Sequence, residues 1–265
     1  MKITVFTSNQ PRHLGLIAAL ASSADEVYAI QECNTVRPGQ ISDLIGKSDV
    51  MRDYFQRVRA AEKAVFGSGG FSPSNVRQLA IRMGDLNLLD LPDFGPALEA
   101  DAFVVFGASY IKGALADFLV RHRAYNIHMG VSPYYRGSST NFWALHDGRP
   151  QYVGATIHLL TAGLDSGPVL FHALPPAEAT EPFLLGMSAV RVAHQGFVQS
   201  LADGTLTTMD AIPQDKSREL RYTRNADFTD DIATEYLDRL PSAKLIQRSL
   251  EARRISDFVR PFIGR

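Results

Sequence analysis

The sequence predicts an α/β protein built on a mostly parallel sheet, and three observations carry this prediction. Short β-branched and aromatic segments alternate with segments whose apolar residues recur at helical spacing. The first two strand-like segments, residues 2–7 and 27–30, are separated by a helical pattern over residues 14–21, and neighbouring parallel strands need such a crossover. Residues 103–107 form a continuous apolar run, which is typical of a strand covered on both faces.

The remaining elements follow the same alternation. We expect helices over residues 51–65, 115–120, 140–146 and 182–201, and strands over residues 78–83, 125–128, 153–160 and 168–173. After Gly204 the pattern changes: residues 205–212 and 219–223 predict a β-hairpin, and two helices are expected over residues 230–240 and 243–259. The sequence therefore predicts a core of residues 1–204 and a small C-terminal hairpin-and-helix appendage of residues 205–265.

Composition excludes several classes of protein. The chain has 265 residues, 45% of them hydrophobic, which is enough for a sizeable core and too much for a disordered chain. Its 27 Lys and Arg residues against 28 Asp and Glu residues give a formal charge of −1, so bulk charge does not attract nucleic acid or an anionic membrane. Cys33 is the only cysteine, which rules out an intrachain disulfide and a cysteine-based zinc cluster. With no long apolar stretch and no signal peptide evident, we expect a soluble cytoplasmic protein.

Polar residues that fit one kind of chemistry gather between residues 126 and 167. Asn126 and His128 are two residues apart on a predicted strand, so their side chains share a face. Asp165 follows the next predicted strand in a glycine-flanked loop, where it can orient an imidazole and raise its pKa, while an amide can donate to an oxyanion. The set suits acyl transfer, although each pattern alone also fits a structural hydrogen-bonding pair or an ordinary turn.

Residues 103–172 resemble the folate-dependent formyltransferase family in the order and spacing of four motifs. These are Asn126-Ile127-His128, Tyr135-Arg136-Gly137, the run Val-Gly-Ala-Thr-Ile-His at residues 153–158, and Leu164-Asp165-Ser166-Gly167. The resemblance extends more loosely back to the first residue. It implies a Rossmann-like domain that binds N10-formyltetrahydrofolate as co-substrate and transfers its formyl group to a primary amine. In that family the catalytic positions correspond to Asn126, His128 and Asp165.

The resemblance also implies where the folate binds. The family's folate pocket involves the loop after the strand that precedes the Asn-x-His motif. We therefore expect Gly107, Ser109, Tyr110 and Ile111 to contact the folate from one side and Gly163 from the other, although an ordinary strand-to-helix turn explains each residue equally well. The histidines show no ligand spacing on a common helix face, so no metal is expected. His158 is expected to pack rather than to act.

The family includes enzymes that act on methionyl-tRNA, on glycinamide ribonucleotide and on nucleotide-linked amino sugars. The segment after residue 205 looks too short and too helical for the basic C-terminal barrel of the tRNA enzymes. The turn at residues 8–13 lacks the glycines of the glycinamide ribonucleotide enzymes. Residues 126–143 look closest to the sugar N-formyltransferases, which formylate dTDP- or GDP-linked 4-amino-4,6-dideoxy sugars used in surface polysaccharides such as lipopolysaccharide O-antigen. A nucleotide-sugar acceptor is therefore expected, with the other two acceptors as alternatives.

Substrate-binding residues are expected in two places. The start of the first helix and the loop after the Asn-x-His motif supply them, namely Ser8, Asn9, Arg12, His13, Tyr135 and Arg136. A polar turn with a helix cap is the alternative for the first group. Two other functional classes stay open: a hydrolase that passes the formyl group to water, and a non-catalytic nucleotide-sugar binding module. A homodimer formed through the C-terminal region is also expected, with packing of that region on its own core as the alternative.

Overall fold

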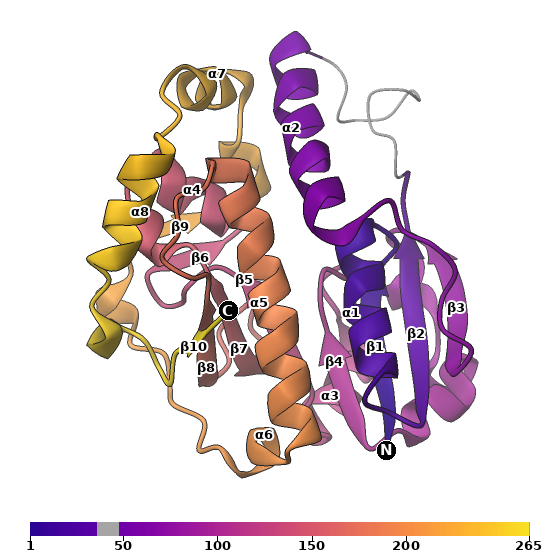
Figure 1. The fold of residues 1–265 in the computed structure, drawn as a ribbon. Helices are drawn as coiled ribbons and strands as arrows, with labels where there is room; N and C mark the ends of the chain where they lie inside the picture. Colours follow the sequence, from indigo (N-terminus) through magenta and orange to yellow (C-terminus); the bar gives the residue numbers. More distant parts are fainter. Residues whose placement is uncertain (36–47, 265) are drawn as a thin grey trace.

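The computed structural model describes residues 1–35 and 48–264. In this part of the chain an eight-stranded sheet has the order β10-β8-β7-β5-β4-β1-β2-β3 (Figure 1), and a second sheet pairs β6 with β9. The strands are β1 (Lys2–Ser8), β2 (Glu26–Cys33), β3 (Val76–Arg82), β4 (Ala102–Val105), β5 (Tyr125–Met129), β6 (Tyr135–Gly137), β7 (Ala155–Leu159), β8 (Val169–Leu174), β9 (Arg221–Thr223) and β10 (Phe262–Ile263). Within the large sheet β7 pairs antiparallel with both neighbours and the other pairings are parallel. The predicted fold class is confirmed.

Helices cover both faces of the large sheet. They are α1 (Pro11–Ala21), α2 (Asp49–Phe66), α3 (Gly113–Arg121), α4 (Thr140–His146), α5 (Pro182–Ala202), α6 (Thr205–Thr208), α7 (Asp230–Asp238) and α8 (Ala243–Glu251), with 3-10 segments that include η1 (Asp85–Leu88) and η2 (Leu91–Glu99). Helices α1 and α5 pack side by side on one face (Figure 1). On the other face α3 and η2 cover the sheet.

Burial on both faces explains the apolar strands. Ile3 and Val5 of β1 pack with Leu16 of α1 on one face, whereas Phe6 packs with Phe94 of η2 on the other. A strand buried in this way cannot alternate apolar and polar residues, and this is why its sequence reads as a continuous apolar run. The β1, α1 and β2 segments therefore form where the sequence predicts them.

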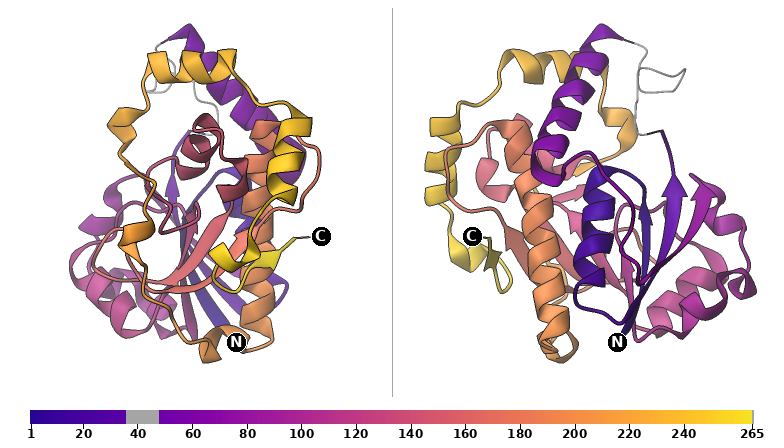
Figure 2. Two further views of the ribbon diagram at one scale, coloured as in Figure 1. Left: turned by 90° about the vertical axis from the view of Figure 1, so that its left-hand side faces the viewer. Right: turned by 45° about the vertical axis from the view of Figure 1, so that its right-hand side comes forward.

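The C-terminal segment packs against the core rather than apart from it (Figure 2). Helix α7 contacts α2, and α8 contacts the short 3-10 turn at Pro150–Tyr152. A separate buried cluster joins these helices to α4 and α5, and its members include Phe142, Phe183, Tyr236 and Ile246. The segment from residue 205 onwards thus shares a hydrophobic core with residues 1–204.

The hairpin expected from residues 205–212 and 219–223 does not form. Residues Thr205–Thr208 are the helical turn α6, because the Asp203 carboxylate accepts hydrogen bonds from the amide and hydroxyl of Thr205 and Leu206 is buried against the preceding helix. Ile212 pairs with Val169, and β9 pairs with β6. The β-branched residues of these segments do enter sheets, but their partners are distant in the sequence.

The pairing of β6 with β9 depends on a glycine. Gly137 has φ of 88°, and a Cβ atom there would lie 1.9 Å from the carbonyl oxygen of Thr223. A residue with a side chain would both strain this backbone and push β9 away. Gly137 therefore allows the C-terminal segment to dock on the loop that follows β5.

Candidate active site

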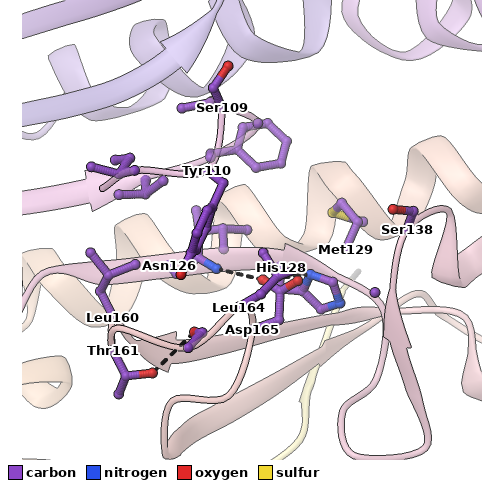
Figure 3. A pocket seen from close by; sticks show the side chains of 18 of the residues that line it. Ser109, Tyr110, Asn126, His128, Met129, Ser138, Leu160, Thr161, Leu164 and Asp165 are labelled. Atoms are coloured by element: carbon purple, nitrogen blue, oxygen red, sulfur yellow. Dashed lines mark hydrogen bonds and ion pairs between the residues drawn. The ribbon is translucent and has the colours of Figure 1, made fainter. Parts of the chain in front are cut away.

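Strand β5 and the loop after β7 bring Asn126, His128 and Asp165 together (Figure 3). Oδ1 of Asp165 lies 3.3 Å from Nδ1 of His128 and accepts a hydrogen bond from Nδ2 of Asn126 at 3.2 Å. Asn126 and His128 project from the same face of β5, as the two-residue spacing requires. The loop that carries Asp165 doubles back over this face, because β7 runs antiparallel to β5.

Asp165 is held in an unusual conformation and in its ionised form. Its φ is 46°, a left-handed value that Asp tolerates better than most residues. Burial alone would raise its pKa, but the His128 charge and hydrogen bond, with contributions from His158 and Asn126, outweigh burial and hold the pKa of Asp165 below its ordinary value. Asp165 is therefore a carboxylate at neutral pH and fixes the Nδ1–H tautomer of His128.

The C-terminal segment holds the Asp165 loop in place. Nε2 of Gln214 donates to the carbonyl oxygens of Asp165 and Gly167, at 2.9 and 2.8 Å. These bonds satisfy two backbone carbonyls of a loop that has left the sheet. No motif marks Gln214 in the sequence, where it lies in the turn of the expected hairpin.

His158 contacts Asn126 and Asp165, although it was expected only to pack. Its Nδ1 bonds to the carbonyl oxygen of Leu159 at 2.8 Å, so Nε2 carries the lone pair and accepts from Nδ2 of Asn126 at 3.0 Å. Burial lowers the pKa of His158 to about 4, which keeps the ring neutral. Both hydrogens of Asn126 Nδ2 are thus used, one by His158 and one by Asp165.

A cavity of about 440 Å³ opens over these residues. Asn126, His128 and Asp165 all line it, and Nε2 of His128 is buried with no hydrogen-bond partner among the described residues. An imidazole that lines a cavity, with a carboxylate on one nitrogen and no partner on the other, can donate or accept a proton when a substrate binds. The arrangement is suited to proton transfer at a bound substrate.

The five residues expected to contact a folate line the same cavity. Gly107, Ser109, Tyr110, Ile111 and Gly163 lie in its walls. Tyr110 links two loops of the cavity wall, since its hydroxyl donates to the carbonyl oxygen of Ala162 at 2.6 Å. Gly107 has φ of 67° and packs against His13, so closely that a Cβ atom would lie 2.5 Å from the ring nitrogen Nε2.

The residues expected to bind phosphate are only partly available. Ser8, Arg12 and His13 line a further cavity of about 310 Å³ at the start of α1. Arg12, however, forms an ion pair with the buried Glu62 at 2.7 Å, and burial holds the pKa of His13 well below its ordinary value. Asn9 exchanges hydrogen bonds with the backbone of Asn34 and so ties together the ends of β1 and β2.

Tyr135 and Arg136 do not line the described cavities, contrary to expectation. Tyr135 is buried and its hydroxyl bonds to Asp147 at 3.1 Å. Arg136 forms an ion pair with Glu219 at 2.9 Å, which joins β6 to the C-terminal segment. The charge of Arg136 thus has a partner 83 residues along the chain.

The structure adds lining residues that the sequence did not indicate. Ser138 and Ser139 follow the matched Arg136 loop, and Asn225 reaches the 440 Å³ cavity from the C-terminal segment. A second cavity of about 300 Å³, between α2, α4, α5 and α7, shares Arg12, Met129 and Ser139 with the first. The site is therefore built from both the core and the C-terminal segment.

Within residues 1–35 and 48–264, no group of three or more His, Cys, Asp and Glu side chains has an arrangement that could hold a metal ion. None of the helices in the same ranges is both long and apolar enough to cross a membrane.

The fold and the site define an α/β domain that presents an Asn-His-Asp cluster at a cavity over the carboxyl end of β5. Residues 91–200, which contain this cluster, match the family model of the formyl transferases. Methionyl-tRNA formyltransferase of Thermosynechococcus vestitus is 36% identical over 108 residues, 37% of this chain. The matched part spans 32% of that relative's length, so the chain aligns with about a third of it.

Solved formyltransferases share the fold over most of the chain. A 4-N formyltransferase from Francisella tularensis has a TM-score of 0.52 and 19% identity, covering 86% of this chain and 77% of its own. An N-formyltransferase from Helicobacter canadensis, solved with folinic acid and dTDP-3-aminofucose, has a TM-score of 0.50 and 12% identity, covering 88% and 78%. At these identities the likeness establishes the fold.

Proposed function

We propose that this chain transfers a formyl group from N10-formyltetrahydrofolate to the primary amine of a nucleotide-linked amino sugar. The observation that carries the proposal is His128, which lines the cavity: its Nδ1 is held by the ionised Asp165, and its buried Nε2 has no hydrogen-bond partner in the described part of the chain. Gly107, Ser109, Tyr110, Ile111 and Gly163 supply the walls for the folate. The folate supplies the formyl group as a reactive amide.

Each side chain has a defined part in this proposal. Protonated His128 donates from Nε2 to the oxyanion that develops on the formyl oxygen, and the Asp165 carboxylate stabilises the imidazolium. Asn126 reaches the same oxyanion by exchanging its 3.2 Å bond to Asp165, while its bond to His158 keeps the amide in orientation. Asp165 then accepts the amine proton, directly or through water, and the bond between the formyl carbon and N10 breaks as N10 takes a proton from His128 and leaves as tetrahydrofolate.

We assign the acceptor to the two remaining cavities. The 300 Å³ cavity adjoins the 440 Å³ cavity through Met129 and Ser139, so an acceptor bound there would have its amine beside the cavity that His128 lines. The 310 Å³ cavity contains Ser8 and also Arg59, which forms no ion pair within the described ranges and so offers a charge for a phosphate. The complex of the Helicobacter canadensis relative with a dTDP-amino sugar supports this acceptor class.

A panel of acceptors tests the proposal. The purified chain is incubated with N10-formyltetrahydrofolate and either a dTDP-amino sugar, a GDP-amino sugar, methionyl-tRNA or glycinamide ribonucleotide, and the product is identified by mass spectrometry. We expect formylation of an amino sugar. Formylation of only the last two acceptors refutes the sugar assignment, formate release without an amine identifies a hydrolase, and ligand binding without turnover identifies a binding module.

A further inference from the structure

The loop of residues 107–112 forms one wall of the 440 Å³ cavity. It leaves the carboxyl end of β4 at Gly107 and enters α3 at Gly113, and Ser109, Tyr110 and Ile111 face the cavity between them. This backbone lies outside the helices and strands, so its polar groups need other partners. The side chains that hold it come from the N-terminal third of the chain.

Glu32 holds the first part of this loop. It lies at the carboxyl end of β2 and is completely buried, with a relative exposure of 0%. Its Oε2 accepts from the backbone amide of Ser109 at 2.6 Å, and its Oε1 accepts from that of Gly84 at 2.9 Å. A buried carboxylate needs donors of this kind, and charge-assisted bonds to it are stronger than neutral ones. Glu32 therefore fixes the position of the Ser109 backbone relative to β2.

Asn87 holds the second part. It lies on η1, where its Nδ2 donates to the carbonyl oxygen of Tyr110 at 2.9 Å and its Oδ1 accepts from the amide of Lys112 at 2.8 Å. One amide side chain thus replaces the backbone partner that a strand would have supplied. Glu32 and Asn87 together bind the backbone of three of the loop's residues, and neither side chain lines the described cavities.

A displacement of this loop would also affect the loop that carries Asp165, on the opposite side of the cavity. The Tyr110 hydroxyl bonds to the carbonyl oxygen of Ala162, three residues before Asp165. The position of the Tyr110 ring in the cavity wall therefore depends on the loop that Glu32 and Asn87 hold. A change at either residue alters the shape of the cavity without removing a group that faces it.

We propose that Glu32 and Asn87 are positioning residues that set the affinity for the formyl donor. They do so by holding the backbone of the 107–112 loop in the position that contacts the ring system of the donor. The inference rests on the proposed function, since it assigns the folate to this cavity. Glu32 and Asn87 act through Ser109 and Tyr110, so they affect the binding of the donor more than the transfer step.

The test compares Glu32→Gln and Asn87→Asp with the parent chain. The first replaces one acceptor oxygen by an amide that faces a backbone N–H, and the second replaces the donor to Tyr110 by a carboxylate oxygen. Loss of one such bond raises the donor Kd and the donor KM by about tenfold, while kcat and the acceptor KM stay within about threefold. Donor affinity is measured by titration with 5-formyltetrahydrofolate, which cannot turn over.

Glu26→Gln is the matched control, because Glu26 begins the same strand and forms its ion pairs with Lys2 and Arg77 at the far end. It is expected to keep the parent's donor Kd. Asn87 is exposed, so its variant folds even where Glu32→Gln lowers the melting temperature. Parent-like donor Kd in both variants overturns the inference alone, as does an equal rise in the acceptor KM. Absence of folate binding by the parent chain overturns the proposed function as well.

Discussion

One oxygen atom, Oδ1 of Asp165, organises the chemistry at the residue scale. It lies within reach of Nδ1 of His128, Nδ2 of Asn126 and, at 4.0 Å, Nε2 of His158. Nδ1 of His128 and Nδ2 of Asn126 compete for this oxygen, so a change in the charge of His128 alters the hydrogen bonds of Asn126. The cluster therefore behaves as a unit, and the effects of single substitutions within it are not additive.

Asp165→Asn tests this unit directly. We expect kcat for formyl transfer to fall by about 10²–10⁴-fold, because an amide cannot stabilise an imidazolium or accept the amine proton. The melting temperature is expected to hold, since burying a neutral amide costs less than burying a carboxylate. Asp203→Asn, at the exposed end of α5, is the control and keeps the parent's kcat. A kcat within about threefold of the parent would refute the role given to Asp165.

The sequence indicates local contacts of this kind better than distant ones. Asn126 and His128 could be paired from their two-residue spacing alone, because a strand has a period of two. The ion pair of Arg136 with Glu219 could not, since it depends on how the C-terminal segment docks. The contact of His158 with Asn126 was missed for a related reason: it requires the β5–β7 register, which places Asn126 opposite His158.

At the element scale most strands that could be predicted are buried on both faces, although β3, expected over residues 78–83, is mostly exposed. Strands β1, β2, β4, β5 and β8 carry enough apolar residues to be recognised from sequence. Strands β6, β9 and β10 are three, three and two residues long, and their neighbours lie far along the chain. Short strands of this kind have no periodicity of their own, so the sequence suggested a local hairpin instead.

The docking of the C-terminal segment on the Asp165 loop gives a prediction at the same scale. Gln214→Ala removes both hydrogen bonds to the backbone of this loop, so Asp165 is held less firmly against His128. We expect kcat to fall by about tenfold, because a small misplacement of a reacting group is costly. Gln247→Ala, a partly exposed glutamine of α8 bonded to Glu251, is the matched control. If both variants have the same kcat, the C-terminal segment does not support the reaction.

At the scale of the whole molecule, buried histidines make the free energy of unfolding depend on pH. Burial lowers the pKa of His158 and His172 to about 4 and that of His194 to about 3, against an ordinary value of 6.5. His172 donates from Nε2 to the Ser132 carbonyl and accepts from the Val259 amide at Nδ1. It thus bridges the loop after β5 and the C-terminal segment only while its ring is neutral.

Because these pKa values are lowered in the folded chain, its stability falls as the pH falls. The folded chain binds fewer protons than the unfolded chain below pH 6.5, so the stability present above this pH is lost as pH falls toward 4. Each of the three rings contributes a loss of about 2 kcal/mol by pH 5. The free energy of unfolding should therefore fall as the pH is lowered from 7 to 5.

Urea unfolding at pH 7, 6 and 5 measures this loss, and His194→Leu isolates one ring. Nε2 of His194 has no hydrogen-bond partner in the described part of the chain, and the ring packs on Phe66 and Phe106, so an apolar side chain suits the site. We expect the variant to lose about 2 kcal/mol less than the parent between pH 7 and 5. The exposed His122→Gln change should leave the loss unaltered. An equal loss in the parent and His194→Leu would show that the acid sensitivity arises elsewhere.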